Sequence, residues 1–128
     1  MTVRSVRFLG IRSAAAPEMV RLYRDVLGLE PFVERPGATW FRLADGTQVH
    51  VYDEGDDDHA FFGPAPVVGL VVDDFDSARA RMAAAGIAFI GEPQREGGTA
   101  WNHYRAPDGN VYELMGPDRP STGAATNG

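Results

Sequence analysis

The stretches "RLADGTQVHVYD" at residues 42–53 and "RAPDGNVYELMG" at residues 105–116 are two copies of one pattern. Each begins with Arg, carries Asp-Gly at the same position and continues into a short apolar segment. The match extends backwards to Trp40, which occupies the position of His103 in the second copy. An Asp-Gly turn between two strand-forming segments predicts a β-hairpin. The sequence therefore predicts the same hairpin twice.

The duplication reaches beyond the hairpins. "RFLGIRS" at 7–13 is similar to "PVVGLVV" at 66–72, and each is followed by a segment with helical character, at 16–28 and 73–86. Short extended segments then lead into each hairpin. Each half thus has the order strand, helix, strand, strand, strand, so we expect an α+β fold of two tandem βαβββ modules forming a curved mixed sheet around a cavity.

Both expected helices carry start and stop signals. Pro17 suits the first turn of the first helix and Gly28 ends it, while Asp74 caps the second helix and Gly86 ends it. The expected core-facing positions are Met19, Leu22, Tyr23, Val26 and Leu27 in the first helix, and Phe75, Ala78 and Met82 in the second.

We expect one domain over residues 1–117, with module one at 4–53, an acidic linker at 54–65 and module two at 66–116. Five of the first six residues of "DEGDDDHAFFGPAP" are acidic, so His59 within it is expected to be solvated. Phe61 and Phe62 are expected to fold over a cleft or to take part in contacts between chains. The tail at 118–128 has little to bury, and disorder is expected there.

Composition narrows the function classes. The net charge of −6 argues against nucleic acid and anionic membranes as partners. The absence of cysteine excludes disulfides, thiolate nucleophiles and cysteine metal sites. No signal-peptide pattern and no long apolar run are present, so a soluble cytoplasmic protein is the simplest expectation.

Turn geometry decides which side chains share a face. A type I turn followed by a left-handed glycine pairs Trp40 with His50 and His103 with Glu113. Because side chains alternate along strands, one face of each hairpin then collects the polar and aromatic residues, and the other face collects the apolar ones. The polar faces hold Trp40, Arg42, Gln48, His50 and Tyr52 in the first copy, and Trp101, His103, Arg105, Val111, Glu113 and Met115 in the second.

The chain resembles the vicinal oxygen chelate superfamily, the glyoxalase, bleomycin-resistance and extradiol-dioxygenase group. The resemblance covers residues 6–116 and depends on "YRDVLGLEPF", "VVGLVVDDFDSARARM" and "RAPDGNVYELMG". It implies a small organic molecule as ligand, a cavity-lining sheet and commonly a dimer.

The resemblance also implies metal-ligand positions on the first and last strands of each module. Here those positions hold Phe8, His50, Val67 and Glu113, and only His50 and Glu113 are able to bind a metal. His103, beside Glu113, could supply a third ligand and complete a set of two histidines and one carboxylate. The cofactor is unknown: a divalent metal ion is one alternative, and a metal-free site is favoured.

Two main functions remain open. The first is a glyoxalase-like enzyme of lyase, isomerase or oxygenase type, with His103 as the base, Glu113 as its orienting group and His50 as a further polar group. The alternative is a non-catalytic binder, like the drug-sequestering proteins of the superfamily. A domain with a vestigial site is a third possibility.

For each candidate a structural role is the competing interpretation. His50 could simply be a hydrogen-bonded strand histidine, and Glu113 a carboxylate kept charged by an arginine. The residues expected to line a ligand site are Phe8, Trp40, Arg42, Tyr52, Val67, Trp101 and Arg105, and several of them could equally be core. The expected partners are a small-molecule ligand and a second copy of the chain in a homodimer.

Overall fold

The computed structural model describes residues 1–118, which divide into two compact modules. The first module comprises residues 7–68, and the second comprises residues 1–6 together with those from Gly69 onward. The expected tail, apart from Asp118, lies outside the described residues. No helix within the described part is long and apolar enough to cross a membrane.

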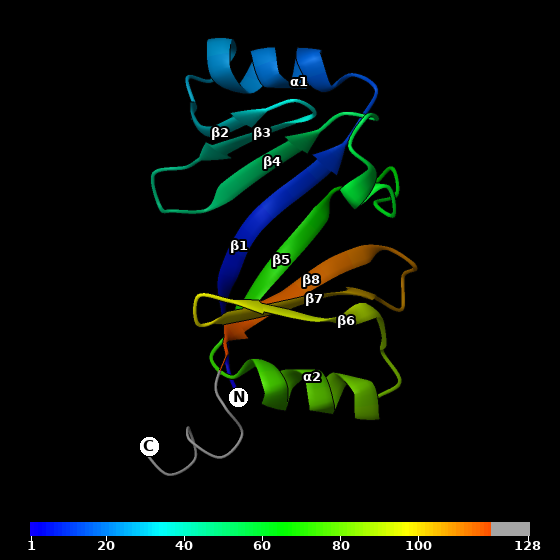
Figure 1. Ribbon diagram of the computed structural model, residues 1–128. Coiled ribbons are helices and arrows are strands. Elements are labelled where there is room, and N and C mark those ends of the chain that lie inside the picture. Colours follow the sequence, from blue (N-terminus) through cyan, green and yellow to red (C-terminus); the bar gives the residue numbers. More distant parts are fainter. Residues whose placement is uncertain (119–128) are drawn as a thin grey trace. The chain divides into compact units, whose positions relative to one another are not determined.

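Figure 1 shows the elements of both modules. The elements up to the linker are β1 (Val3–Arg12), α1 (Ala16–Arg21), the π-helical turn η1 (Leu22–Val26), β2 (Glu30–Arg35), β3 (Ala38–Arg42), β4 (Gln48–Tyr52) and the short 3₁₀ turn η2 (Asp57–His59). The elements that follow are β5 (Val67–Val72), α2 (Phe75–Ala84), β6 (Ala88–Glu96), β7 (Thr99–Arg105) and β8 (Val111–Pro117).

The two modules repeat one topology. The strand order is β2-β3-β4-β1 in the first and β5-β8-β7-β6 in the second. In each module the first strand runs parallel to the last, and the remaining neighbours are antiparallel. The expected pair of βαβββ modules is therefore confirmed.

Both hairpins have the turn that the sequence predicts. The Leu43 amide donates to Thr47 O at 2.7 Å, and the Ala106 amide donates to Asn110 O at 2.9 Å. Gly46 and Gly109 have φ of 88° and 84°, a left-handed conformation that glycine adopts without a Cβ clash. The predicted pairs Trp40–His50 and His103–Glu113 follow from this register.

The first module buries the apolar face of its hairpin under α1. Phe41, Val49, Val51 and Ala16 form its core, with Met19, Val20 and Tyr23 packed against them. The expected stripe was wrong for Leu22, Val26 and Leu27, which are among the exposed large apolar side chains. The helix widens from α-helical to π-helical geometry at Leu22, directly after α1. The residues that face the core are therefore spaced as Ala16, Val20 and Tyr23.

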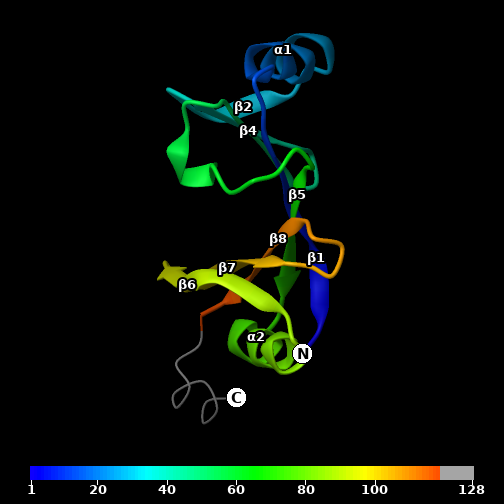
Figure 2. The ribbon, with the colours of Figure 1, turned by 90° about the vertical axis from the view of Figure 1, so that its right-hand side faces the viewer.

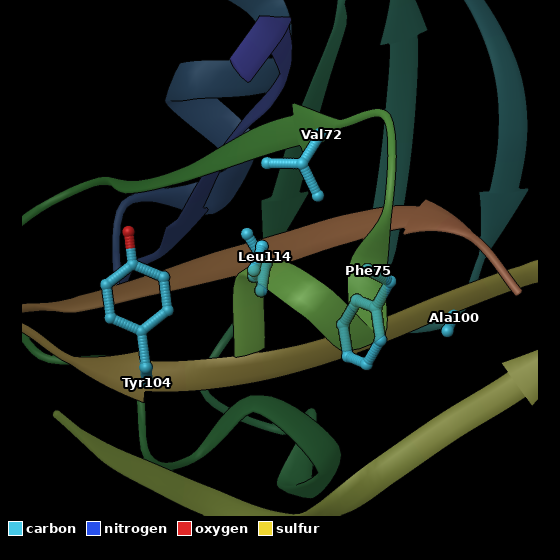
Figure 3. Packing of buried hydrophobic residues seen from close by; sticks show 6 residues of the cluster. Val72, Phe75, Ala100, Tyr104 and Leu114 are labelled. Atoms are coloured by element: carbon cyan, nitrogen blue, oxygen red, sulfur yellow. The ribbon is translucent and has the colours of Figure 1, made fainter. Parts of the chain in front are cut away.

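The second module follows its sequence pattern closely. Asp74 caps α2 by accepting a hydrogen bond from the Ser77 amide at 3.1 Å. Phe75 and Ala78 are buried, and Met82 packs against the same core, as predicted. Figure 3 shows Phe75 with Val72, Tyr104 and Leu114, which come from α2, β5, β7 and β8.

The chain start also belongs to the second module. The Thr2 amide donates to Asp73 Oδ1 at 2.7 Å, and the Asp73 amide donates back to Thr2 O at 3.0 Å. Figures 1 and 2 both place the N-terminus beside α2. The first residues of β1 therefore help to close the second module, and the rest of the strand pairs with β4.

Candidate functional site

An aromatic stack surrounds His50 on the strand face opposite the first-module core. The His50 ring lies between Trp40, at a centroid distance of 3.9 Å, and Phe8, at 4.8 Å, with interplanar angles of 8° and 13°. Gly10 lies next to His50 on β1, and a Cβ there would meet the Phe8 ring at 3.0 Å and the Phe62 ring at 3.1 Å. The local sequence Phe-Leu-Gly thus leaves room for the rings to lie over the strand.

Both ring nitrogens of His50 are engaged. Nε2 and Gln48 Oε1 are 2.8 Å apart, and Nδ1 and the Tyr52 hydroxyl are 3.3 Å apart. The amide oxygen can only accept, so Nε2 carries the proton and Nδ1 accepts from Tyr52. Burial, with smaller contributions from His59 and Arg35, lowers the pKa of His50 to about 3. His50 is therefore a neutral imidazole with fixed hydrogen bonds.

The acidic segment adds to this cluster. The expectation of a solvated His59 was wrong, since its ring stacks on Tyr52 at 3.7 Å and its Nδ1 lies 2.5 Å from Asp56 Oδ2. Phe62 is also buried, with its ring edge-on to Tyr52. The sequence signal that could have indicated this was the pair of aromatics directly after His59, because solvated linkers seldom carry them.

The second module contains a separate polar pair. His103 Nε2 and Glu113 Oε2 are 3.0 Å apart across β7 and β8. The Glu113 side chain is 8% exposed and the His103 side chain 17%. A buried carboxyl group whose histidine partner is more exposed suits a proton-transfer role, because the histidine can meet another molecule while the carboxyl group stays shielded.

Burial raises the pKa of Glu113 to about 8. The protonated form of Glu113 is therefore favoured near neutral pH, and its hydroxyl lies where it can donate to His103 Nε2. The expected charge partner, an arginine, is not what Glu113 contacts. Arg105 instead donates to Gly109 O at 2.8 Å within its own turn.

The remaining predicted ligand residues are spread over both modules. Trp101 is half-buried and pairs with Met115, and Val67 is buried. Arg42 is exposed, and its guanidinium lies 4.1 Å from the centre of the Phe32 ring, which is edge-on to Trp40.

The residues at the implied metal positions fit a metal ion poorly. His50 would have to give up Gln48 or Tyr52 to coordinate, and Phe8 and Val67 have no ligating atom. Within residues 1–118, no three His, Cys, Asp or Glu side chains are grouped so that they could hold a metal. A catalytic metal ordinarily needs about three protein ligands.

Comparison with known proteins agrees with this architecture. Residues 6–114 match the family described as the Glyoxalase/Bleomycin resistance protein/Dioxygenase superfamily. The chain belongs to this superfamily. No curated protein matches the sequence significantly.

Several solved structures share the fold at low sequence identity. A superfamily member from Vibrio splendidus 12B01 is 21% identical, with a TM-score of 0.66 over 90% of this chain and 99% of its own. Methylmalonyl-CoA epimerase from Mycobacterium tuberculosis is 18% identical, with a TM-score of 0.64 over 91% and 90%. A variant of the Streptomyces coelicolor methylmalonyl-CoA epimerase, in complex with 2-nitronate-propionyl-CoA, is 16% identical, with a TM-score of 0.63 over 92% and 100%. At these identities the structures establish the shared fold and do not assign a substrate.

Proposed function

We propose that this superfamily member is an enzyme that moves a proton on a small organic molecule, using His103 and Glu113 without a metal. The observation that supports this is the 3.0 Å contact between His103 and a buried Glu113 whose pKa is raised to about 8. A pair that gains and loses one proton near neutral pH is matched to acid–base catalysis.

The proton balance follows from the two nitrogens of His103. In the deprotonated pair, Nε2–H donates to the Glu113 carboxylate and Nδ1 is the base. When Nδ1 takes a proton from the substrate, the Nε2 proton passes to Glu113, so no net charge is created on the imidazole. The reverse sequence returns a proton to the substrate. Glu113 thus acts as a positioning and proton-storing group, and His103 is the residue proposed to touch the substrate.

A pH profile tests this assignment. We expect the activity that needs the deprotonated pair to rise through about pH 8, the pKa of Glu113. Glu113→Gln cannot store the proton, so the pH profile of this variant should no longer show the rise in activity near pH 8. Its rate should also fall about 10²-fold or more, as for loss of an acid–base group. His103→Gln should fall similarly at every pH, while Arg81→Gln, an exposed change on α2, serves as the control.

Exchange of substrate hydrogen for solvent deuterium provides the readout. A panel of small 2-oxo acids, hydroxyketones and acyl thioesters is incubated with the protein in D2O, and loss of C–H signal is followed by proton NMR. Exchange that is unchanged in both His103→Gln and Glu113→Gln would contradict the proposal.

A second candidate, a non-catalytic binder of planar molecules, is favoured by one specific feature of the first module. The Trp40 indole nitrogen is buried without a hydrogen-bond acceptor among residues 1–118, beside the stacked rings of Phe8 and His50. A buried donor of this kind is normally satisfied, so a ligand carrying an acceptor group would relieve it. Saturable binding that quenches Trp40 fluorescence, is lost in Trp40→Phe and leaves the ligand chemically unchanged would support this function over the enzyme.

A further inference from the structure

The acid–base pair of the second module lies on the sheet face opposite α2. Tyr104 and Leu114 belong to the core that also contains Phe75 of α2 (Figure 3). His103 and Glu113 directly precede them in β7 and β8, and side chains alternate along a strand, so the pair faces the other side of the sheet. The residues that share this second face are therefore the ones that a substrate of His103 would meet.

Uncharged residues border the pair on each strand of this module. The strand register identifies them as Gly69 and Val71 on β5, Ile90 on β6, Trp101 on β7 and Met115 on β8. Ile90 pairs with His103, and Trp101 pairs with Met115 two positions away from the acid–base pair. The side chains of Ile90, Trp101 and Met115 are half-buried, so each of them presents apolar surface to another molecule.

The nearest arginine along β7 is directed to another group. Arg105 is two residues from His103 and starts on the same face of the strand. Its Nη1 donates to Gly109 O at 2.8 Å, which holds the guanidinium at the hairpin turn. An anionic group placed between Trp101 and Ile90 would therefore not meet this cation.

This environment favours an uncharged substrate over an anion. A carboxylate placed against Ile90, Trp101 and Met115 would lose hydration without gaining a hydrogen-bonded cation, which costs free energy. An apolar substituent has the opposite preference, because each methylene group that it buries there should improve binding about four-fold.

We infer that the substrate of the His103–Glu113 pair is a neutral carbonyl compound whose apolar substituent lies against Trp101 and Met115. This inference rests on the proposed proton-transfer function and adds the chemical class of the substrate. The C–H bond next to the carbonyl group breaks, its proton goes to His103 Nδ1, and its electron pair moves to the carbonyl oxygen. Return of the proton from His103 to carbon reverses these changes. Ile90, Trp101 and Met115 are then specificity-determining residues.

Three compounds test the substrate class: 4-methyl-2-oxopentanoate, its methyl ester, and methyl pyruvate. Exchange of C–H for deuterium in D2O is measured for each, with the exchange in the absence of protein subtracted. We expect kcat/KM for the branched ester to exceed that of the acid about ten-fold or more, because the acid brings a carboxylate to an apolar surface. It should exceed that of methyl pyruvate by a similar factor, because its branched substituent buries additional carbon.

Two positions on this face can be changed to alter the preference. Trp101→Ala should raise KM for the branched ester about ten-fold and change kcat little, because it removes contact with the substituent only. Ile90→Lys places a cation next to His103, so the ratio of kcat/KM for acid to ester should rise about ten-fold or more. Ile90→Gln is polar but uncharged and should not produce this rise, and Arg81→Gln on α2 should leave all ratios unchanged. Ratios within one variant cancel any general loss of activity.

Binding without turnover separates this inference from the proposed function. It is followed for the same compounds through the amide NMR signals of Trp101 and Met115. Equal kcat/KM for acid and branched ester, no advantage over methyl pyruvate, or a wild-type preference in folded Ile90→Lys would overturn the inference and leave proton transfer standing. Saturable binding of the branched ester in preference to the acid, without exchange, would support the apolar site and contradict proton transfer. Neither binding nor exchange with any of the three compounds would contradict both.

Discussion

At the scale of single residues, burial shifts the pKa values of two titratable groups in opposite directions. His50 is held neutral by burial within the aromatic stack, with smaller contributions from His59 and Arg35, whereas Glu113 is held protonated by burial beside a histidine. Both residues occupy twin hairpin positions, yet their surroundings have diverged. His50 is part of an aromatic cluster, and Glu113 has a histidine partner suited to proton transfer.

The neutrality of His50 predicts acid sensitivity. Its folded pKa of about 3 lies below the unfolded value of 6.5, so the unfolded chain binds the extra proton between these values. Stability from this group is complete above pH 6.5 and falls as pH drops toward 3, by up to about 1.4 kcal/mol per pH unit. The variant His50→Phe keeps an aromatic ring in the stack but has no titratable group at this position, so it isolates the effect of the histidine.

Urea unfolding at pH 7, 6, 5 and 4 measures this effect. At pH 7 the variant should be less stable by about 1–2 kcal/mol through its lost hydrogen bonds. The difference in stability between the two proteins should then shrink as the pH falls, because only the wild type loses the His50 contribution, whereas the other acid-sensitive groups titrate in both. Parallel curves over this range would show that His50 is not held neutral.

At the scale of elements, close backbone contact fixes how β5 and β8 meet. A Cβ at Gly116 would lie 2.5 Å from the Val72 carbonyl oxygen and 3.2 Å from Val72 Cγ2. Since the first of these atoms is backbone, the strands would have to shift to accept any side chain. This glycine is required by strand contact and not by a left-handed φ.

Gly116→Ala should therefore destabilise the fold by about 1–3 kcal/mol, as overpacking of a close contact does. The matched control is Gly63→Ala, because a Cβ at Gly63 would meet no atom within 4 Å and its φ is not in the left-handed region. The midpoints of urea unfolding compare the two variants. Equal midpoints would contradict the importance of this contact.

At the scale of the whole molecule, assembly as a homodimer remains our prediction. The sequence predicts that the contact between the two chains involves Phe61, Phe62 and the following "GPAPVV" stretch. Phe62 is 7% exposed, whereas Phe61 is half-buried with its ring edge-on to Phe62, so Phe61 is the more accessible aromatic of the two. Two-fold dimers are also the commonest oligomers.

Light scattering over a concentration series up to tens of micromolar should give twice the 13.9 kDa mass of one chain. Phe61→Asp should lower the mass towards one chain by placing a charge in the contact. The control, Val26→Asp, changes an apolar side chain that is already 73% exposed and should leave the mass unchanged. A single-chain mass for the wild type, or dissociation by Val26→Asp alone, would contradict this prediction.

The sequence by itself determined the parts of this protein that depend on neighbouring residues. The Asp-Gly turns set the hairpin register because glycine alone adopts the left-handed position easily, and that register paired His103 with Glu113. The Asp74 cap and the Gly86 stop likewise delimited α2. Duplication of these local signals was enough to predict both βαβββ modules.

The tertiary structure decided what depends on packing between distant segments. The solvent exposure of Leu22 and Val26 follows from the π-helical widening, which hydrophobic periodicity does not reveal. The burial of His59 against Tyr52 depends on how the acidic segment folds back on β4. The raised pKa of Glu113 and the lowered pKa of His50 arise because dehydration depends on the atoms packed around each group, and sequence neighbours do not specify those atoms.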